Sequence, residues 1–282
     1  MKLSDRGVLL TPSFRVWQAT KLDKRASQQV TSDNDAYQGV ARVNKTLLPG
    51  VQQYKDVIAK KQSIYLFVRR ETLPYLYEGT FLCPTAKFMD VQRGWNQQVS
   101  EWQTVLETFY DVYPSLYRNA QIRLGKLWDE QDYPSVDTIA HRFSAELTVS
   151  PVPDVDSFYQ ALADDAAEEV AKEWEQVKAP RLEEVVKKDV YERLLTVVTK
   201  MHERIKDPAA TFKDSLVCNL RDLVSEVDKL NITQDPTMDA IKQELMATVC
   251  PVSPDVLRSD FKARSETAIR TKELMDRLQG LI

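Results

Sequence analysis

A regular stripe of large apolar residues between residues 88 and 128 constrains this chain more than any other feature of its sequence. The apolar positions recur at steps of three and four, which places them on one face of an α-helix, like the a and d positions of a heptad. Pro114 lacks an amide hydrogen, so we expect it to kink this helix or split it in two. A cofactor box or a base-stacking platform could have the same spacing, but the pattern is most typical of a packed helix seam. The stripe comprises Trp95, Val99, Trp102, Leu106, Phe109, Tyr113, Leu116, Ala120, Leu124 and Leu127.

Glycine is scarce, with seven residues in a chain of 282. Tight β-hairpins and Gly-rich loops depend on glycine, so its scarcity favours long helices. The later helices have narrow apolar stripes and broad charged faces, a pattern that hairpins within one chain and seams between chains share. Further helices are predicted at 22–48, 51–71 and 156–178, and another runs from Pro180 to 205. Capping signals predict the starts of three more helices, at Asp207-Pro208, at Asp235-Pro236 and at Ser253-Pro254, and the last of these ends at 278.

Alternating apolar and polar residues predict a small β-sheet. The clearest strand covers 142–149, and a single strand is not stable alone. We expect it to pair with 7–19 and with the short apolar stretch 80–83. The fold class is therefore mainly α with a small β-sheet (α+β), with long helices and coiled-coil-like hairpins. We divide the chain into a mixed α/β region, 1–153, and a helical region, 154–282.

Charge is unevenly distributed along the chain. Residues 1–70 carry 13 Lys or Arg against 5 Asp or Glu, a net +8, whereas 71–150 carry −5 and 151–282 carry −7. Such a basic segment could neutralise nucleic-acid phosphates or bind an acidic partner; alternatively, it packs on the acidic remainder of the chain. The candidate contact residues are Arg15, Trp17, Lys21, Lys24, Arg25, Arg42, Lys45, Lys60, Lys61, Arg69 and Arg70.

The sequence offers little support for catalysis. It contains no G-x-x-x-x-G-K-[ST], G-x-G-x-x-G or G-x-S-x-G motif, and His141 and His202 do not form an H-E-x-x-H site. Cys83 lies in an apolar segment and is interpreted as structural rather than reactive. An acidic cluster could bind a hard cation, although we interpret it as a solvated loop: Asp129, Glu130, Asp132 and Asp137. We therefore expect no enzymatic activity, no cofactor and no metal.

The location expected from the sequence is the cytoplasm. The first residues contain no apolar signal region, and no apolar run approaches the ~20 residues that span a bilayer. The three cysteines are far apart and form no C-x-x-C pair, which fits a reducing compartment. We expect no membrane partner.

A series of short motifs over roughly residues 1–160 resembles a family of uncharacterised proteins of tailed phages and prophages, classed as a domain of unknown function. The motifs are Phe14-Arg15-Val16-Trp17, Lys21-Leu22-Asp23-Lys24-Arg25, Asn44-Lys45, Thr72-Leu73-Pro74-Tyr75, Asp132-Tyr133-Pro134 and Pro151-Val152-Pro153. The resemblance implies a phage origin and a gene near a MoxR-type AAA+ ATPase and a von Willebrand A-type protein. It implies a non-catalytic partner of an ATPase module and assigns no catalytic residue.

Two functions remain open from the sequence. The first is a phage interaction or assembly protein in the host cytoplasm, a homo-oligomer that self-associates through long helices and serves as a partner of an AAA+ ATPase. The alternative is a nucleic-acid-binding protein in phage DNA metabolism or in protection from host nucleases.

Overall fold

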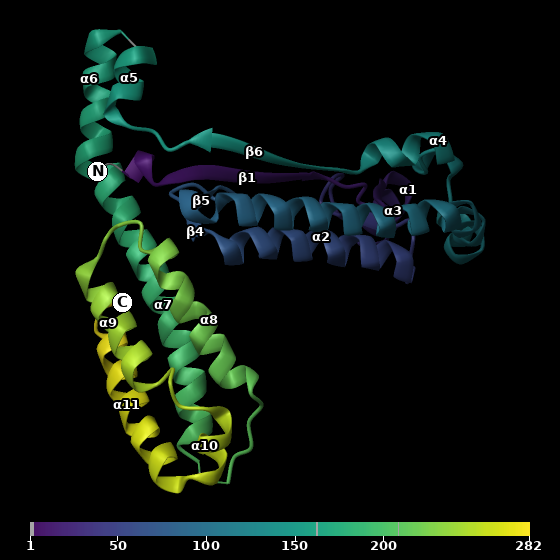
Figure 1. Cartoon of the computed structure of the whole chain (residues 1–282). Helices are drawn as coiled ribbons and strands as arrows, with labels where there is room; N and C mark the ends of the chain where they lie inside the picture. The colour runs from purple at the N-terminus through teal and green to yellow at the C-terminus, as the bar shows by residue number, and fades with distance from the viewer. Residues whose placement is uncertain (1–2, 162, 208) are drawn as a thin grey trace. The chain divides into compact units, whose positions relative to one another are not determined.

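The chain is mainly α-helical with a small antiparallel β-sheet, which confirms the predicted fold class (Figure 1). The computed structural model describes residues 3–161, 163–207 and 209–282. Two compact units form, each from segments that are not consecutive: unit 1 comprises 1–11, 69–91 and 148–282, and unit 2 comprises 12–68 and 92–147. The division into 1–153 and 154–282 stays a prediction.

The main sheet has four strands in the order β4-β5-β1-β6. They are β4 (Leu73–Pro74), β5 (Phe81–Pro84), β1 (Gly7–Arg15) and β6 (Ser144–Pro151). The predicted partnership of the segments 7–19, 80–83 and 142–149 is therefore confirmed. β1 and β5 pair antiparallel from Gly7 opposite Pro84 to Leu10 opposite Phe81. Gly7 fits this pairing because a Cβ there would lie 2.7 Å from the Leu82 side chain.

The predicted helix at 22–48 is largely wrong. Only α1 (Lys24–Asp33) is helical, between the strands β2 (Thr20–Asp23) and β3 (Val43–Thr46), which form a two-stranded antiparallel ribbon. Asp23 ends β2 and starts α1, because its carboxylate accepts a hydrogen bond from the Ala26 amide at 2.9 Å. Local capping and strand pairing therefore override the weak helical pattern.

Helices α2 (Gln52–Glu71) and α3 (Phe88–Leu124) confirm two predicted helices. α3 continues through Pro114, so the predicted split is wrong. Pro114 is exposed, and water can reach the carbonyl oxygen that loses its helical partner there. Within unit 2 the two helices approach closely at Gly94, where a Cβ would overlap the ring of Phe67.

Unit 1 is dominated by helices from the second half of the chain. They are α5 (Val155–Ala161), α6 (Asp164–Glu173), a π-helical turn (Trp174–Lys178), α7 (Ala179–Ile205), α8 (Ser215–Leu230), α9 (Pro236–Thr248), α10 (Pro254–Ser259) and α11 (Phe261–Gln279). α7 packs between α8 and α11, and α9 lies against both of these neighbours (Figure 1). Their shared apolar core includes Val190, Leu194, Leu220, Leu245 and Leu274.

Four predicted helix boundaries in unit 1 need correction. The helix predicted at 156–178 is divided, because Ala163 is extended between α5 and α6. Pro180 lies in the first turn of α7, directly after the π-helical turn, so the helical path from α6 into α7 continues without a break at this proline. The helix expected from Asp207 begins only at Ser215, and Pro208, like the inward position predicted for Leu162, falls outside the described residues. Asp260 divides the last helix because its carboxylate accepts from the amides of Lys262 and Ala263.

Other predicted boundaries are confirmed. Asp235 caps α9 by accepting a hydrogen bond from the Thr237 amide at 2.9 Å. Short helical turns complete the described chain at Leu3–Asp5, Thr85–Lys87, Gly125–Leu127, Glu130–Asp132, Val136–Ile139 (α4) and Ala140–Arg142. Across the described ranges, none of the helices has both the length and the apolar character needed to cross a bilayer.

Candidate interaction surfaces

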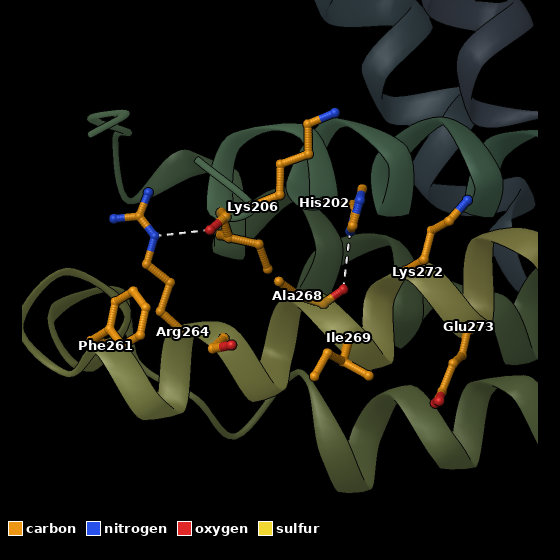
Figure 2. A pocket seen from close by; sticks show the side chains of 10 residues that line it. His202, Lys206, Phe261, Arg264, Ala268, Ile269, Lys272 and Glu273 are labelled. Carbon is orange, nitrogen blue, oxygen red and sulfur yellow. Dashed lines mark hydrogen bonds between the residues drawn. The ribbon is translucent and has the colours of Figure 1, made fainter. Parts of the chain in front are cut away.

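A groove between α7 and α11 is the first candidate site, and it lies entirely in unit 1 (Figure 2). Its volume is about 340 Å³. Two large apolar side chains of α11 stand at its edge: Phe261 is 70% exposed and Ile269 is 59% exposed. Ser265 lies between them, so the three residues follow one another at steps of four along one face of the helix. This face, Phe261-Ser265-Ile269, is called the α11 outer stripe below.

Arg264 fixes one end of the groove through Nε and one terminal nitrogen of its guanidinium. Its guanidinium donates to the carbonyl oxygens of Ile205 at 2.9 Å, Arg204 at 3.1 Å and Ala210 at 3.0 Å, and also to that of Asp207. These carbonyls lie at and just beyond the end of α7, where helical partners are missing. The buried arginine therefore joins α11 to the end of α7.

His202 fixes the middle of the groove from the α7 side. Its Nδ1 lies 3.0 Å from the carbonyl oxygen of Ala268 and 3.2 Å from the hydroxyl oxygen of Thr271. A carbonyl oxygen only accepts hydrogen bonds, so Nδ1 carries the hydrogen and donates it. The imidazole thus links α7 to α11.

The lysines around the groove have carboxylate partners on their own helices. Lys206 Nζ lies 2.6 Å from a Glu203 oxygen, and Lys272 Nζ lies 2.7 Å from an Asp276 oxygen. Among the described residues, no cluster of three or more His, Cys, Asp or Glu is arranged to hold a metal ion. What the groove presents to an incoming molecule is therefore mainly the apolar surface of the α11 outer stripe.

The predicted basic contact residues separate into two groups. Four lysines of unit 2 contact groups of the same unit. Lys45 is buried between Asp132 and Asp23, Lys21 lies 3.7 Å from Asp132, Lys60 binds Glu101 and Gln98, and Lys61 lies over the ring of Phe14. These side chains stabilise the fold, in agreement with the alternative in which the basic segment packs internally.

The second group is exposed to solvent. Arg15, Lys24, Arg25 and Arg42 are exposed, and within the described part of the chain none of them forms an ion pair. Arg69 and Arg70 are also exposed but belong to unit 1, where their carbonyl oxygens accept hydrogen bonds from Arg193. The structure thus does not bring all eleven predicted residues together.

Trp17 belongs to an aromatic cluster inside unit 2. Its ring lies 6.2 Å from Tyr54, 5.9 Å from Tyr113 and 6.5 Å from Tyr133, measured between centroids. Its backbone carbonyl accepts a hydrogen bond from the Tyr54 hydroxyl at 2.8 Å. Burial raises the pKa of all three tyrosines, to about 12 for Tyr133. Trp17 is therefore engaged in packing and is not presented for base stacking.

The predicted stripe of α3 lies in the core of unit 2. Trp102 is 1% exposed and donates its indole N–H to the carbonyl oxygen of Val57 at 3.0 Å. Phe14 packs against it from β1, with ring centroids 6.2 Å apart. Val99, Leu116 and Leu124 of the predicted stripe are half-buried, and Leu127 is exposed beyond the end of α3. The other six stripe positions are buried: Trp95, Trp102, Leu106, Phe109, Tyr113 and Ala120.

Cys83 and the acidic cluster are the two remaining candidates for chemistry, and residues of both are buried or paired within the fold. Burial raises the pKa of the Cys83 thiol to about 12, so the reactive thiolate is scarce at neutral pH. In the acidic cluster, Asp132 is bound to Lys45 and Glu130 accepts a hydrogen bond from the Tyr117 hydroxyl at 3.0 Å.

Sequence reasoning missed the groove between α7 and α11. The sequence contains a sign of this groove, because the last helix carries two series of apolar or small residues. The series Phe261-Ser265-Ile269 is offset from the buried series that includes Thr271, Leu274 and Leu278. Comparisons of the chain with protein-family models, with curated proteins and with solved structures found no match.

Proposed function

We propose that this chain is a non-enzymatic interaction and assembly protein that self-associates through the α11 outer stripe. The observation that carries the proposal is the exposure of Phe261 and Ile269 at the edge of one groove. Large apolar side chains gathered on one exposed face commonly mark a protein interaction site. An amphipathic helix laid in a groove is a frequent form of such a contact.

The occupant that fits the stripe is α11 of a second copy. Phe261 and Ile269 lie four residues before and after Ser265, so the stripe reads large-small-large in both directions. In an antiparallel pair centred on Ser265, Phe261 of each copy lies opposite Ile269 of the other, and the small serines face each other. A two-fold interface requires this kind of self-complementary surface.

The proposed dimer is concentration-dependent because the stripe is only one helix wide. Contacts this small fall at the weak end of protein interfaces. We expect sedimentation velocity to show monomer at about 1 µM and dimer at about 100 µM or above, a micromolar equilibrium. High salt should leave the equilibrium unchanged, because apolar contacts are not screened.

The decisive variant is Phe261→Ser with Ile269→Ser, which should remain monomeric throughout that range. Ile122→Ser with Met246→Ser is the matched control, because it removes two exposed apolar side chains elsewhere. A wild-type chain that stays monomeric at the highest concentration, or a stripe variant that dimerises like the control, would refute self-association through α11.

The wider biological setting is also part of the proposal. The resemblance of residues 1–160 supports a tailed-phage origin, host cytoplasm as location, and a MoxR-type AAA+ ATPase as a protein partner. Addition of the purified chain to such an ATPase should change its rate of ATP hydrolysis. An unchanged rate, with no complex in sedimentation, would exclude that ATPase as a partner.

A further inference from the structure

A second groove lies in unit 2, where α1, the end of β2 and the loop 36–42 meet. Its volume is about 640 Å³. The α1 face that lines it is polar, because Lys24, Gln28 and Ser32 recur at steps of four. Arg42 and Gln38 of the loop also line the groove. Among the described residues that line this groove there is no Asp or Glu.

The two cations of this groove differ from Lys45 and Lys60 of the same unit. Lys45 and Lys60 are neutralised by carboxylates at short range. Lys24 and Arg42 are exposed, and the described part of the chain supplies neither with an ion-pair partner. The groove therefore combines two unneutralised charges with two neutral amides and three hydroxyls, although the chain as a whole carries −4.

An aromatic side chain projects from the same loop. Tyr37 is 89% exposed, and its neighbours Ala36 and Gln38 both line the groove. Trp17 and Tyr54, by contrast, pack against each other inside unit 2. A solvent-exposed ring on the loop that also carries the exposed cation Arg42 matches single-strand recognition, in which cations follow the phosphates and aromatic rings stack on bases.

We propose that this groove binds single-stranded nucleic acid, with phosphates on Lys24 and Arg42 and a base stacked on Tyr37. A duplex fits less well because its bases are already stacked on one another. An acidic peptide would satisfy the cations but leave Tyr37 without a base. This inference is independent of self-association, because the α11 outer stripe belongs to unit 1 and the groove to unit 2.

Fluorescence anisotropy of the full chain with a labelled oligothymidylate of about 20 nucleotides tests the proposal, since bound single strands commonly span ~4–16 nucleotides per site. The Kd should rise with salt on a log–log plot. In Lys24→Gln with Arg42→Gln, that slope should fall by about 1.4, which corresponds to two lost phosphate contacts at about 0.7 each. Lys55→Gln with Lys126→Gln is the matched control, because both lysines are exposed in unit 2 and do not line the groove.

Tyr37→Ala separates stacking from charge. It should weaken binding about fivefold or more and leave the salt slope unchanged, because it removes a ring and no charge. Phe261→Ser with Ile269→Ser should bind the oligonucleotide like the wild type. Equal losses of affinity in the groove and control variants would overturn the proposal, and so would tighter binding of a duplex than of a single strand. If polyglutamate binds equally well and Tyr37→Ala does not weaken its binding, the ligand is an acidic polypeptide instead.

Discussion

The Nζ of Lys45 lies 2.6 Å from Oδ2 of Asp132, and each side chain is only 8% exposed. Lys45 also donates to the carbonyl oxygen of Leu127 at 2.6 Å and lies 3.6 Å from Asp23. Burial lowers the pKa of Lys45, but the hydrogen bond and charge of Asp132, with help from Asp23, outweigh this and hold the pKa above its ordinary value. One interior ion pair thus connects β3 to the segment that follows α3.

Lys45→Ala should lower the free energy of unfolding by about 3–5 kcal/mol, because it leaves Asp132 buried without its main partner. Lys21→Ala is the control: Lys21 is exposed and 3.7 Å from the same carboxylate, so its loss should cost about 1 kcal/mol or less. Urea unfolding followed by circular dichroism gives both values. Equal losses would show that the buried pair contributes nothing special.

Trp102→Ala should lower the free energy of unfolding by about 3–5 kcal/mol, because it removes a large side chain that is almost completely buried. Ile122→Ala on the same helix should have little effect, since Ile122 is 83% exposed. Urea unfolding of the two variants at equal protein concentration measures the difference. Near-wild-type stability of Trp102→Ala would contradict the packing interpretation of the stripe.

Arg264→Lys should destabilise unit 1 by about 2–3 kcal/mol. An ammonium group cannot reach the several carbonyl oxygens that the guanidinium fork satisfies at the end of α7. Arg270→Lys on the same helix is the control, because Arg270 is exposed and makes one long hydrogen bond, 3.4 Å, to Thr248. Thermal unfolding should separate the two variants. If they melt together, Arg264 is not needed to hold the helix end.

Stability should fall in acid because of Lys87, which lies 3.1 Å from Glu71 and 2.9 Å from Glu226. Burial alone would raise the pKa of both glutamates, but hydrogen bonds from Lys87 and a second cation on each glutamate hold the pKa of both below the ordinary 4.5. A depressed carboxylate pKa stabilises the fold above the unfolded value, and this contribution disappears as pH falls through the folded value.

The measurement is urea unfolding of the wild type and Lys87→Met from about pH 6 to about pH 3, the range that spans the unfolded carboxylate pKa. The variant should be less stable at the upper end and should lose less stability on acidification. Lys188→Met is the control, because its 3.9 Å pair with Glu192 is half-exposed. If the free energy of unfolding falls with pH in parallel for the wild type and Lys87→Met, Lys87 is not the cause of the loss of stability in acid.

Patterns within one element predicted much of this fold. The spacing from Trp95 to Tyr113 located α3, and the alternation at 142–149 located β6 and its sheet partners. Asp235-Pro236 marked the start of α9, because capping chemistry is encoded by adjacent residues. Local signals suffice where an element is determined by its own residues.

Predictions that depended on distant residues were weaker. Lys24 and Lys45 are indistinguishable in the sequence, yet one is exposed and the other is buried against Asp132, far along the chain. The apolar periodicity of the sequence does not predict that Asp260 divides the last helix. The α11 outer stripe went unnoticed because a second narrow apolar series on a charged helix is visible only once the first series is known to be buried.

The interleaving of the two units has a consequence for synthesis. Every segment of unit 2 lies before residue 148, so these segments have all left the ribosome while most of unit 1 is still untranslated. β1 begins at Gly7, yet the core that buries Leu9 also contains Leu274 and Leu278. Leu9 therefore joins a core that is completed only after α11 has been made.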